Sequence, residues 1–237
     1  MKKRILFIHH STGALLLFFG GIRKLIKEKY PDMELWDHAY NLYPLKIISY
    51  LVGPFTFRTG LSDGNGMMVG RDFDITTSND SPKDYAEIFS RTKSDNTLKK
   101  ILDFDVVIFK NCFPTSRIET GKKLAQFKQY YDRIMLNLSR YSNQFVIFTP
   151  PPLRAEMNNQ NWANNARALS AHIIKTARMY RNISVFDFFG LLSDDSEGNI
   201  NMLKRSYCNL LPIDSHPNIR ANMEIGKEFV EFIAKYA

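Results

Sequence analysis

The sequence is poor in cysteine, and this scarcity excludes two common kinds of protein. Its 237 residues include only two cysteines, Cys112 and Cys208, which cannot form the disulfide framework of a small secreted domain. The sequence also has no C-x-x-C and no H-E-x-x-H pattern. His9 and His10 lie at the end of a predicted strand, on which neighbouring side chains point to opposite faces, so they are poor joint ligands for one ion. We therefore expect no metal site, and we interpret Cys112 as a buried packing residue.

Long apolar runs are also lacking. No run reaches the roughly 20 residues of a membrane span. The run from Ile5 to Ile8 ends at His9, and it is shorter than the about 7–15 apolar residues of a secretory signal. We therefore expect a cytoplasmic protein without a transmembrane segment.

Positive charge is abundant but not concentrated. The formal net charge is +8, yet Lys and Arg are scattered along predicted helices and form no long basic run. No zinc-finger, helix-turn-helix or RNA-binding motif is present, which argues against nucleic acid as a partner. A basic surface favours an anionic glycan or an ester close to lipid as the substrate.

Short apolar runs alternate with segments of helical period, and this alternation predicts the fold. The run between Asp105 and Lys110 contains no polar residue, as expected for a strand covered on both faces. Strand–helix alternation predicts a parallel sheet, and right-handed crossovers narrow it to a flavodoxin-like, doubly wound α/β/α sandwich in three layers. We expect one domain over residues 1–237 with five strands: Arg4–His9, Glu34–Ala39, Asp105–Lys110, Gln144–Thr149 and Ile183–Phe188.

Start signals and segments of helical period predict five helices. Apolar residues at three- and four-residue steps predict a helix over Gly13–Glu28. Ser81-Pro82 and the capping-box spacing of Ser116 to Glu119 predict two helix starts. Two further helices are expected over about 162–180 and after Pro217.

An irregular insertion is expected at about residues 42–80. A segment this long and rich in Gly and Asp inside a compact domain is typical of a functional loop or lid. Its apolar part, Leu45 to Phe57, fits either a helix packed on the body of the protein or a patch that contacts an acyl chain or a membrane surface.

Polar side chains follow two predicted strands and precede the last helix. Ser11 lies between the first strand and Gly13, at a turn that exposes a hydroxyl beside the free N–H groups of a helix start. The same position suits a helix N-cap, so this stretch alone leaves both roles open. A serine nucleophile needs a base and oxyanion donors. His216, with Asp214 two residues before it, and Asn111 after the third strand are residues of the required types.

The order and placement of these motifs resemble the SGNH (GDSL-like) hydrolase superfamily. IHHS stands where that family has Gly-Asp-Ser, FKNC where it has G-x-N-D, and DSHPN where it has D-x-x-H. Together with DHAYN and TPPPL, they look like a bacterial hydrolase-like subgroup with an HHSTG nucleophile block. The resemblance extends from Ile5 to Val230.

The resemblance implies a role for each matching residue. Ser11 would be the nucleophile and lend its backbone N–H to the oxyanion hole, Asn111 would be an oxyanion donor, and His216 the base. His9-His10 replace the Gly-Asp of the family, and Asp214 lies two residues before the histidine instead of three, so a full triad and a Ser–His dyad both stay open. Less well matched positions take the remaining roles: Gly60 in the oxyanion hole, and His10 and Asn41 in substrate binding.

The resemblance thus implies a serine-dependent hydrolase that acts on acyl or acetyl esters of small molecules or glycans without any cofactor. If a sugar hydroxyl resolved the same acyl-enzyme, the protein would be an O-acyltransferase. The altered residues around Ser11 would also fit a non-catalytic glycan-binding protein. The sequence leaves these alternatives open, together with the substrate and the oligomeric state.

Overall fold

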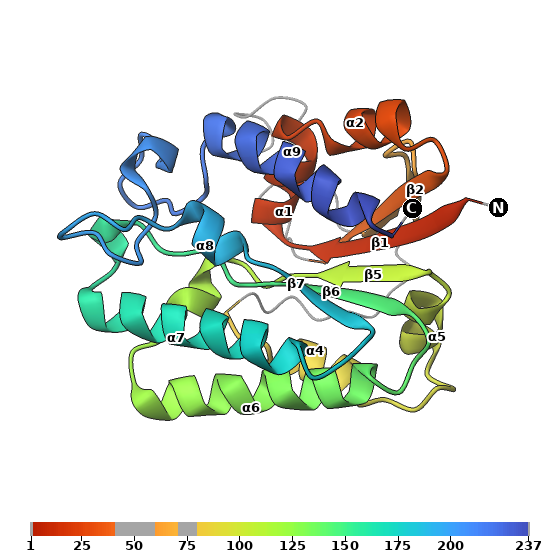
Figure 1. The fold of residues 1–237 in the computed structure, drawn as a ribbon, viewed down its shortest axis with the longest axis horizontal. Helices are drawn as coiled ribbons and strands as arrows, with labels where there is room; N and C mark the ends of the chain where they lie inside the picture. The colour runs from red at the N-terminus through yellow and green to blue at the C-terminus, as the bar shows by residue number, and fades with distance from the viewer. Residues whose placement is uncertain (1, 41–59, 71–79, 237) are drawn as a thin grey trace.

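A seven-stranded sheet forms the centre of the computed structural model, which describes residues 2–40, 60–70 and 80–236 (Figure 1). The strand order is β4-β3-β2-β1-β5-β6-β7. Five strands are parallel, and their carboxyl ends meet at one edge of the sheet. The parallel strands are β1 (Lys3–His9), β2 (Met33–Ala39), β5 (Val106–Phe109), β6 (Gln144–Phe148) and β7 (Ile183–Phe186).

The expected fold class is confirmed, but the sheet has seven strands instead of the expected five. All five are present within two residues of their expected ends. Two more, β3 (Gly60–Ser62) and β4 (Met68–Gly70), extend the β2 edge as antiparallel strands, so the sheet is mixed. Each has only three residues, too few to show a hydrophobic period. They lie within the expected insertion, of which residues 42–59, including the apolar segment 45–57, and 71–79 fall outside the described residues.

Helices cover both faces of the sheet. On one face lie α1 (Ser11–Phe19), α2 (Ile22–Lys29) and α9 (Ile219–Ala234), and on the other α4 (Lys83–Ile88), α6 (Gly121–Leu138) and α7 (Gln160–Ala177) (Figure 1). The side chains of β1 alternate between two cores: Ile5 and Phe7 pack with the first set, and Leu6 and Ile8 with the second. This explains why the strand is apolar throughout. The remaining helices are α5 (Asn96–Leu102), α8 (Phe188–Leu192) and three short 3₁₀ helices at Phe113–Ser116, Ala155–Met157 and Arg205–Tyr207.

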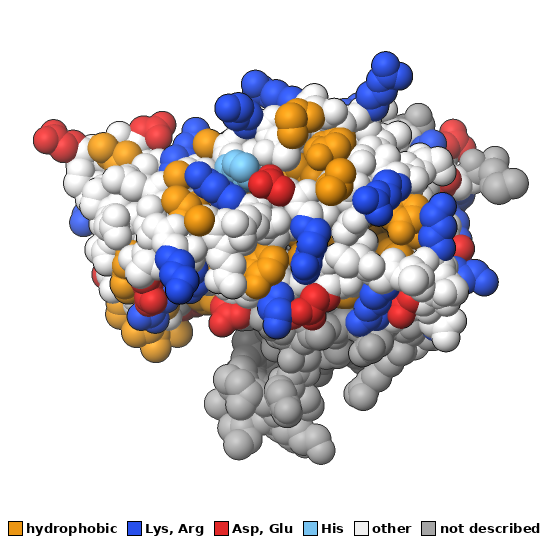
Figure 2. All heavy atoms as spheres, turned by 90° about the horizontal axis from the view of Figure 1, so that it is seen from below, with side chains coloured by type: hydrophobic (Ala, Val, Ile, Leu, Met, Phe, Trp, Pro, Cys, Tyr) orange, Lys and Arg blue, Asp and Glu red, His pale blue; other side chains and the backbone are white. Residues whose placement is uncertain are grey.

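Many of the basic residues lie on these outer helix faces, as their scatter in the sequence indicated. Figure 2 looks onto the side covered by α6 and α7, and Lys and Arg side chains are spread among apolar and acidic ones there. None of the described helices is long and apolar enough to cross a membrane.

Two expectations about helix ends are wrong. The predicted helix over Gly13–Glu28 is two helices, α1 and α2, which meet at Gly20-Gly21, where Gly21 has a φ of 60° that favours glycine. The predicted capping box at Ser116 does not start a helix, because the Ser116 hydroxyl donates to Pro151 O instead. The cap of α6 is Thr120, whose hydroxyl accepts from Lys123 N. The helix starts expected near Ser81, near residue 162 and after Pro217 are confirmed within two residues.

Two glycines allow α1 and α9 to pack closely. A Cβ atom on Gly226 would lie 2.6 Å from Gly20 Cα and 2.9 Å from Gly20 O. Backbone atoms cannot move aside as a side chain can. Because α1 begins at Ser11 and α9 follows His216, the contact helps to set the relative positions of these two residues.

We expect Gly226→Val to lower the free energy of unfolding by about 3 kcal/mol, the upper end for an overpacked site. Urea unfolding measures the loss. Gly121→Val is the matched control, since a Cβ atom on Gly121 meets nothing within 4 Å, and its midpoint should stay near that of the wild type. Equal midpoints for both variants would show that the two helices can separate without cost.

Candidate active site

Ser11 is the first residue of α1, directly after β1 at the carboxyl edge of the sheet. His10 is extended and occupies the N-cap position, and its carbonyl accepts from Gly13 N at 2.9 Å and Ala14 N at 3.0 Å. Ser11 is therefore not the N-cap of this helix. The N–H groups of Ser11 and Thr12 are the first two of the helix, which have no acceptor within it. They can bind a negative charge beside the Ser11 hydroxyl.

The two histidines before Ser11 are buried, and their contacts hold the turn between β1 and α1 in place. His9 is buried, and its Nε2 lies 2.9 Å from Asp37 Oδ2. The other oxygen of that carboxylate, Oδ1, pairs with Arg23. A Cβ atom on Gly13 would lie 2.4 Å from His9 Cβ, so only glycine allows the helix to start so close to the strand. His10 is also buried, with its ring edge-on to Tyr40 at 3.9 Å between centroids. The expectation that His10 contacts substrate stays a prediction.

Ser11, His216 and Asp214 are joined by two successive hydrogen bonds. Ser11 Oγ is 2.7 Å from His216 Nε2, and His216 Nδ1 is 2.5 Å from Asp214 Oδ1. The backbone N–H of His216 also donates to Asp214 Oδ1 at 2.9 Å, and Asn209 Nδ2 donates to Asp214 Oδ2 at 3.1 Å. With the carboxylate holding the proton on Nδ1, Nε2 is free to accept the proton of the Ser11 hydroxyl.

A buried arginine fixes the loop that carries His216. Arg154 Nη1 donates to the carbonyls of Leu211, Asn209 at 3.1 Å and Asp214 at 3.4 Å. The ring of Phe113 packs edge-on against His216 at 4.9 Å between centroids. The imidazole is therefore held by packing and hydrogen bonds on several sides.

These contacts change the pKa values of both groups. Burial lowers the pKa of His216, but the hydrogen bonds and charges of Asp214 and Cys112 outweigh burial and raise that pKa to about 9. Burial raises the pKa of Asp214, but the hydrogen bond and charge of His216 outweigh it and lower that pKa below its usual value. The pair therefore favours an imidazolium beside a carboxylate.

Asn111 is buried just after β5, at the same edge of the sheet as Ser11. Its Oδ1 accepts from the Tyr131 hydroxyl at 3.0 Å, and its Nδ2 donates to Ser81 O at 3.1 Å. An amide nitrogen carries two hydrogens, so one hydrogen remains after the contact with Ser81. These contacts set the orientation of the amide.

The other expected residues are placed as follows. Gly60 begins β3 opposite Ala39, with a φ of 133° that favours glycine, and Ala39 in turn pairs with His9. Gly60 is thus two strands from the turn that carries Ser11. Asn41 lies outside the described residues. Among the described residues, no group of three His, Cys, Asp or Glu side chains could hold a metal ion.

Two residues contact the first turn of α1, at Ser11 and Thr12, in a way that the sequence did not indicate. Cys112 is buried, as expected, but its Sγ is 3.5 Å from both Ser11 Oγ and Thr12 Oγ1. Lys110 is also buried and donates to Thr12 Oγ1. The signal that could have found them is the polar Lys-Asn-Cys sequence at the end of an apolar strand, which places all three residues at the same edge of the sheet as Ser11.

No protein-family model and no curated protein matches this sequence. The fold is similar to that of solved structures. A mutant of Axe2, an acetylxylan esterase from Geobacillus stearothermophilus, matches with a TM-score of 0.55 and 11% identity over 98% of this chain and 95% of its own. A protein described as a lipolytic protein of the G-D-S-L family, from Desulfitobacterium hafniense DCB-2, matches with a TM-score of 0.50 and 13% identity over 97% of this chain and 99% of its own. The resemblance to the SGNH hydrolases is thus confirmed at the level of the fold.

Proposed function

We propose that this protein is a serine ester hydrolase of the SGNH type. The observation that carries the proposal is the line of hydrogen bonds from Ser11 Oγ through His216 to Asp214, with heavy-atom distances of 2.7 and 2.5 Å. A nucleophile, a base in contact with it and an acid that orients the base are the three parts that acyl transfer requires.

In the proposed reaction, Ser11 Oγ attacks the ester carbonyl while His216 Nε2 takes the hydroxyl proton. Asp214 holds the proton on Nδ1 and stabilises the imidazolium that forms. The first N–H groups of α1 and the remaining amide hydrogen of Asn111 bind the oxyanion, and Gly60 is the further candidate donor. The imidazolium then protonates the leaving alcohol, and a water activated by His216 releases the acid. The chain's own side chains and backbone supply every proton acceptor and donor in these steps.

The fold of an acetylxylan esterase supports an acetyl or other acyl ester, including one on a glycan, as the substrate class. The transferase alternative uses the same acyl-enzyme and differs only in the acceptor. A glycan added to the assay separates the two, because a hydrolase releases free acid and a transferase moves the acyl group to the sugar.

A fluorophosphonate probe and 4-nitrophenyl acetate test the proposal directly. We expect one covalent label per chain, located at Ser11 by peptide mass spectrometry, and release of 4-nitrophenol. Heat-denatured protein is the control and should take no label. A folded protein that neither takes the label nor hydrolyses small esters would instead be a binding protein on this scaffold.

We expect Asn111→Ala to lower kcat by about 10²–10³ with little change in KM, because an oxyanion donor acts mainly on the transition state. Steady-state kinetics on 4-nitrophenyl acetate measure both constants. Tyr131→Phe is the matched control, since it removes the hydroxyl bound to Asn111 Oδ1 but keeps the amide, and its loss of kcat should be much smaller. A raised KM with unchanged kcat would place Asn111 in ground-state binding.

A further inference from the structure

A buried lysine that the proposed mechanism does not use contacts Thr12, the residue after Ser11. Lys110 directly follows β5, and only 1% of its surface is exposed. Its ammonium donates to Thr12 Oγ1 and, at 3.1 Å, to Asn111 O, and it lies 5.5 Å from the centre of the Phe188 ring. No carboxylate in the described part of the chain forms an ion pair with it, although fully buried lysines are almost always paired.

The unpaired ammonium is costly to the fold. Removal from water disfavours the charged form, and burial accordingly lowers the pKa of Lys110 to about 8. A methionine of similar volume would fill the same space among apolar neighbours without this cost. The positive charge therefore calls for an explanation outside the stability of the resting protein.

A short series of polar contacts leads from Lys110 to the nucleophile. Thr12 Oγ1, which accepts from Lys110, is 3.5 Å from Cys112 Sγ, and Cys112 Sγ is 3.5 Å from Ser11 Oγ. Burial raises the pKa of the Cys112 thiol, but the hydrogen bond of His216 and the charge of Lys110 outweigh burial and lower that pKa to about 6. A group in contact with the Ser11 oxygen thus responds to the charge of Lys110.

We propose that the buried positive charge of Lys110 directly stabilises the negative charge that develops beside Ser11 when the ester carbonyl becomes a tetrahedral oxyanion. This inference rests on the proposed function. A buried, fixed charge acts more strongly on a developing charge than a solvated one does, and it needs no rearrangement during the reaction. The oxyanion is then an oxygen anion near the ammonium, which no carboxylate of the described residues supplies in the resting protein. The hydrogen bond to Thr12 holds the first turn of α1 in the same place.

Lys110→Met tests the inference, because it keeps most of the length of the side chain and removes the charge. We expect kcat on 4-nitrophenyl acetate to fall by about 10²-fold, with KM within about threefold of the wild type, as for the loss of one oxyanion donor. We also expect the urea midpoint to stay unchanged or to rise, because an unpaired buried charge has been removed. A purely structural lysine would give the opposite result, a lower midpoint with kcat per folded molecule unchanged.

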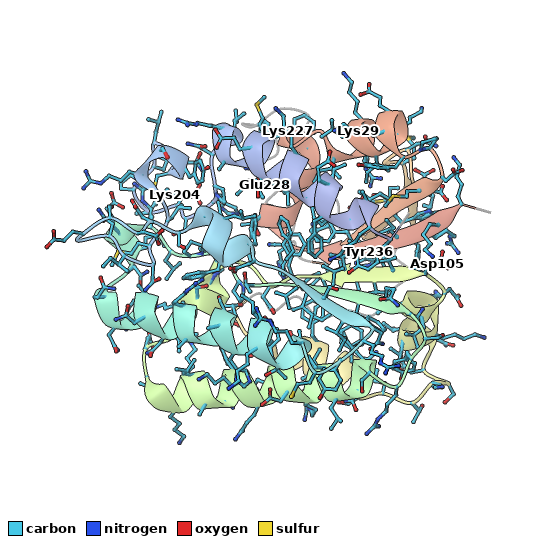
Figure 3. The ribbon with its side chains drawn as sticks, in the orientation of Figure 1. Lys29, Asp105, Lys204, Lys227, Glu228 and Tyr236 are labelled. Atoms are coloured by element: carbon cyan, nitrogen blue, oxygen red, sulfur yellow. The ribbon has the colours of Figure 1, made fainter. Side chains whose placement is uncertain are left out.

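Lys204→Met is the matched control. Lys204 lies on the side of the carboxyl edge of the sheet. Asp105, just before β5, lies on the opposite side and shows the direction of the strand (Figure 3). Its ammonium donates to a backbone carbonyl, Leu191 O, at 2.9 Å, but it has no contact with Ser11 or Thr12. Its loss should leave kcat, KM and the urea midpoint near their wild-type values.

Cys112→Ala separates a direct effect of the charge from one carried by the thiol. We expect Lys110→Met to lower kcat by the same factor in the wild-type and Cys112→Ala backgrounds, since independent effects multiply. An effect that vanishes in Cys112→Ala would mean that Lys110 acts only on the thiol, and the inference would be overturned. Equal rates of fluorophosphonate labelling in the wild type and Lys110→Met would also overturn it. A wild type that takes no label would instead mean that the proposed function itself has failed.

Discussion

We expect Ser11→Ala to abolish ester hydrolysis, with a loss in kcat on the order of 10⁴ or more, and to abolish covalent labelling by a fluorophosphonate. The hydroxyl is the atom that forms the acyl-enzyme, and alanine leaves His216 with no nucleophile to activate. Its contact with His216 Nε2, at 2.7 Å, is the main reason for this expectation.

The fold should survive this substitution. The N-cap of α1 is His10, so alanine at position 11 removes no capping hydrogen bond and is a better helix former than serine. The urea midpoint should therefore stay near that of the wild type. Ser206→Ala is the matched control, because Ser206 is exposed in the short helix at Arg205–Tyr207, and full labelling should remain. If Ser11→Ala kept wild-type turnover on 4-nitrophenyl acetate, the mechanism proposed here would be wrong.

Long apolar strands were predictable because each carries its own signal. The run Ile5 to Ile8 is apolar on both faces, and the structure divides its side chains between two cores. The strands β3 and β4 have three residues each and depend on pairing with β2, which a local pattern does not record. The start of α6 was misplaced for a similar reason, since the Ser116 hydroxyl is taken by Pro151 O, a partner 35 residues away in the sequence.

Ser11 and Asn111 were expected at one edge of the sheet, because the carboxyl ends of parallel strands meet there. His216 follows no strand, and only the resemblance to the SGNH hydrolases assigned it to the same site. The part played by Asp214 could not be decided from spacing. The structure gives the reason: the His216 backbone N–H and Nδ1 both lie against Asp214 Oδ1, so the chain turns back within two residues. Cys112 and Lys110 were missed because their contacts cross from β5 to α1, between segments about 100 residues apart.

The second large effect is expected at the His216–Asp214 pair. His216→Ala should lose nearly as much activity as Ser11→Ala, because a base and the nucleophile it activates act as a unit. A Ser–His dyad would predict a small loss for Asp214→Asn. The 2.5 Å contact instead favours a full triad, in which asparagine stabilises the wrong tautomer of the imidazole and lowers kcat by about 10³–10⁴.

The pH dependence of kcat/KM gives an independent measure of the same contact. His216 acts as a base only in its neutral form, and its raised pKa, about 9, keeps the proton on the ring to higher pH than in a free histidine. Activity should therefore rise with pH along a limb whose midpoint lies above the ordinary value of 6.5 and near 9. Asp214→Asn removes a carboxylate that raises this pKa, so the limb of the residual activity should move to lower pH.

Asp195→Asn, at an exposed position, is the control and should leave both kcat and the limb in place. A variant at position 214 that kept most of its turnover and the wild-type limb would show that the carboxylate only supports the loop, and that Ser11 and His216 act as a dyad.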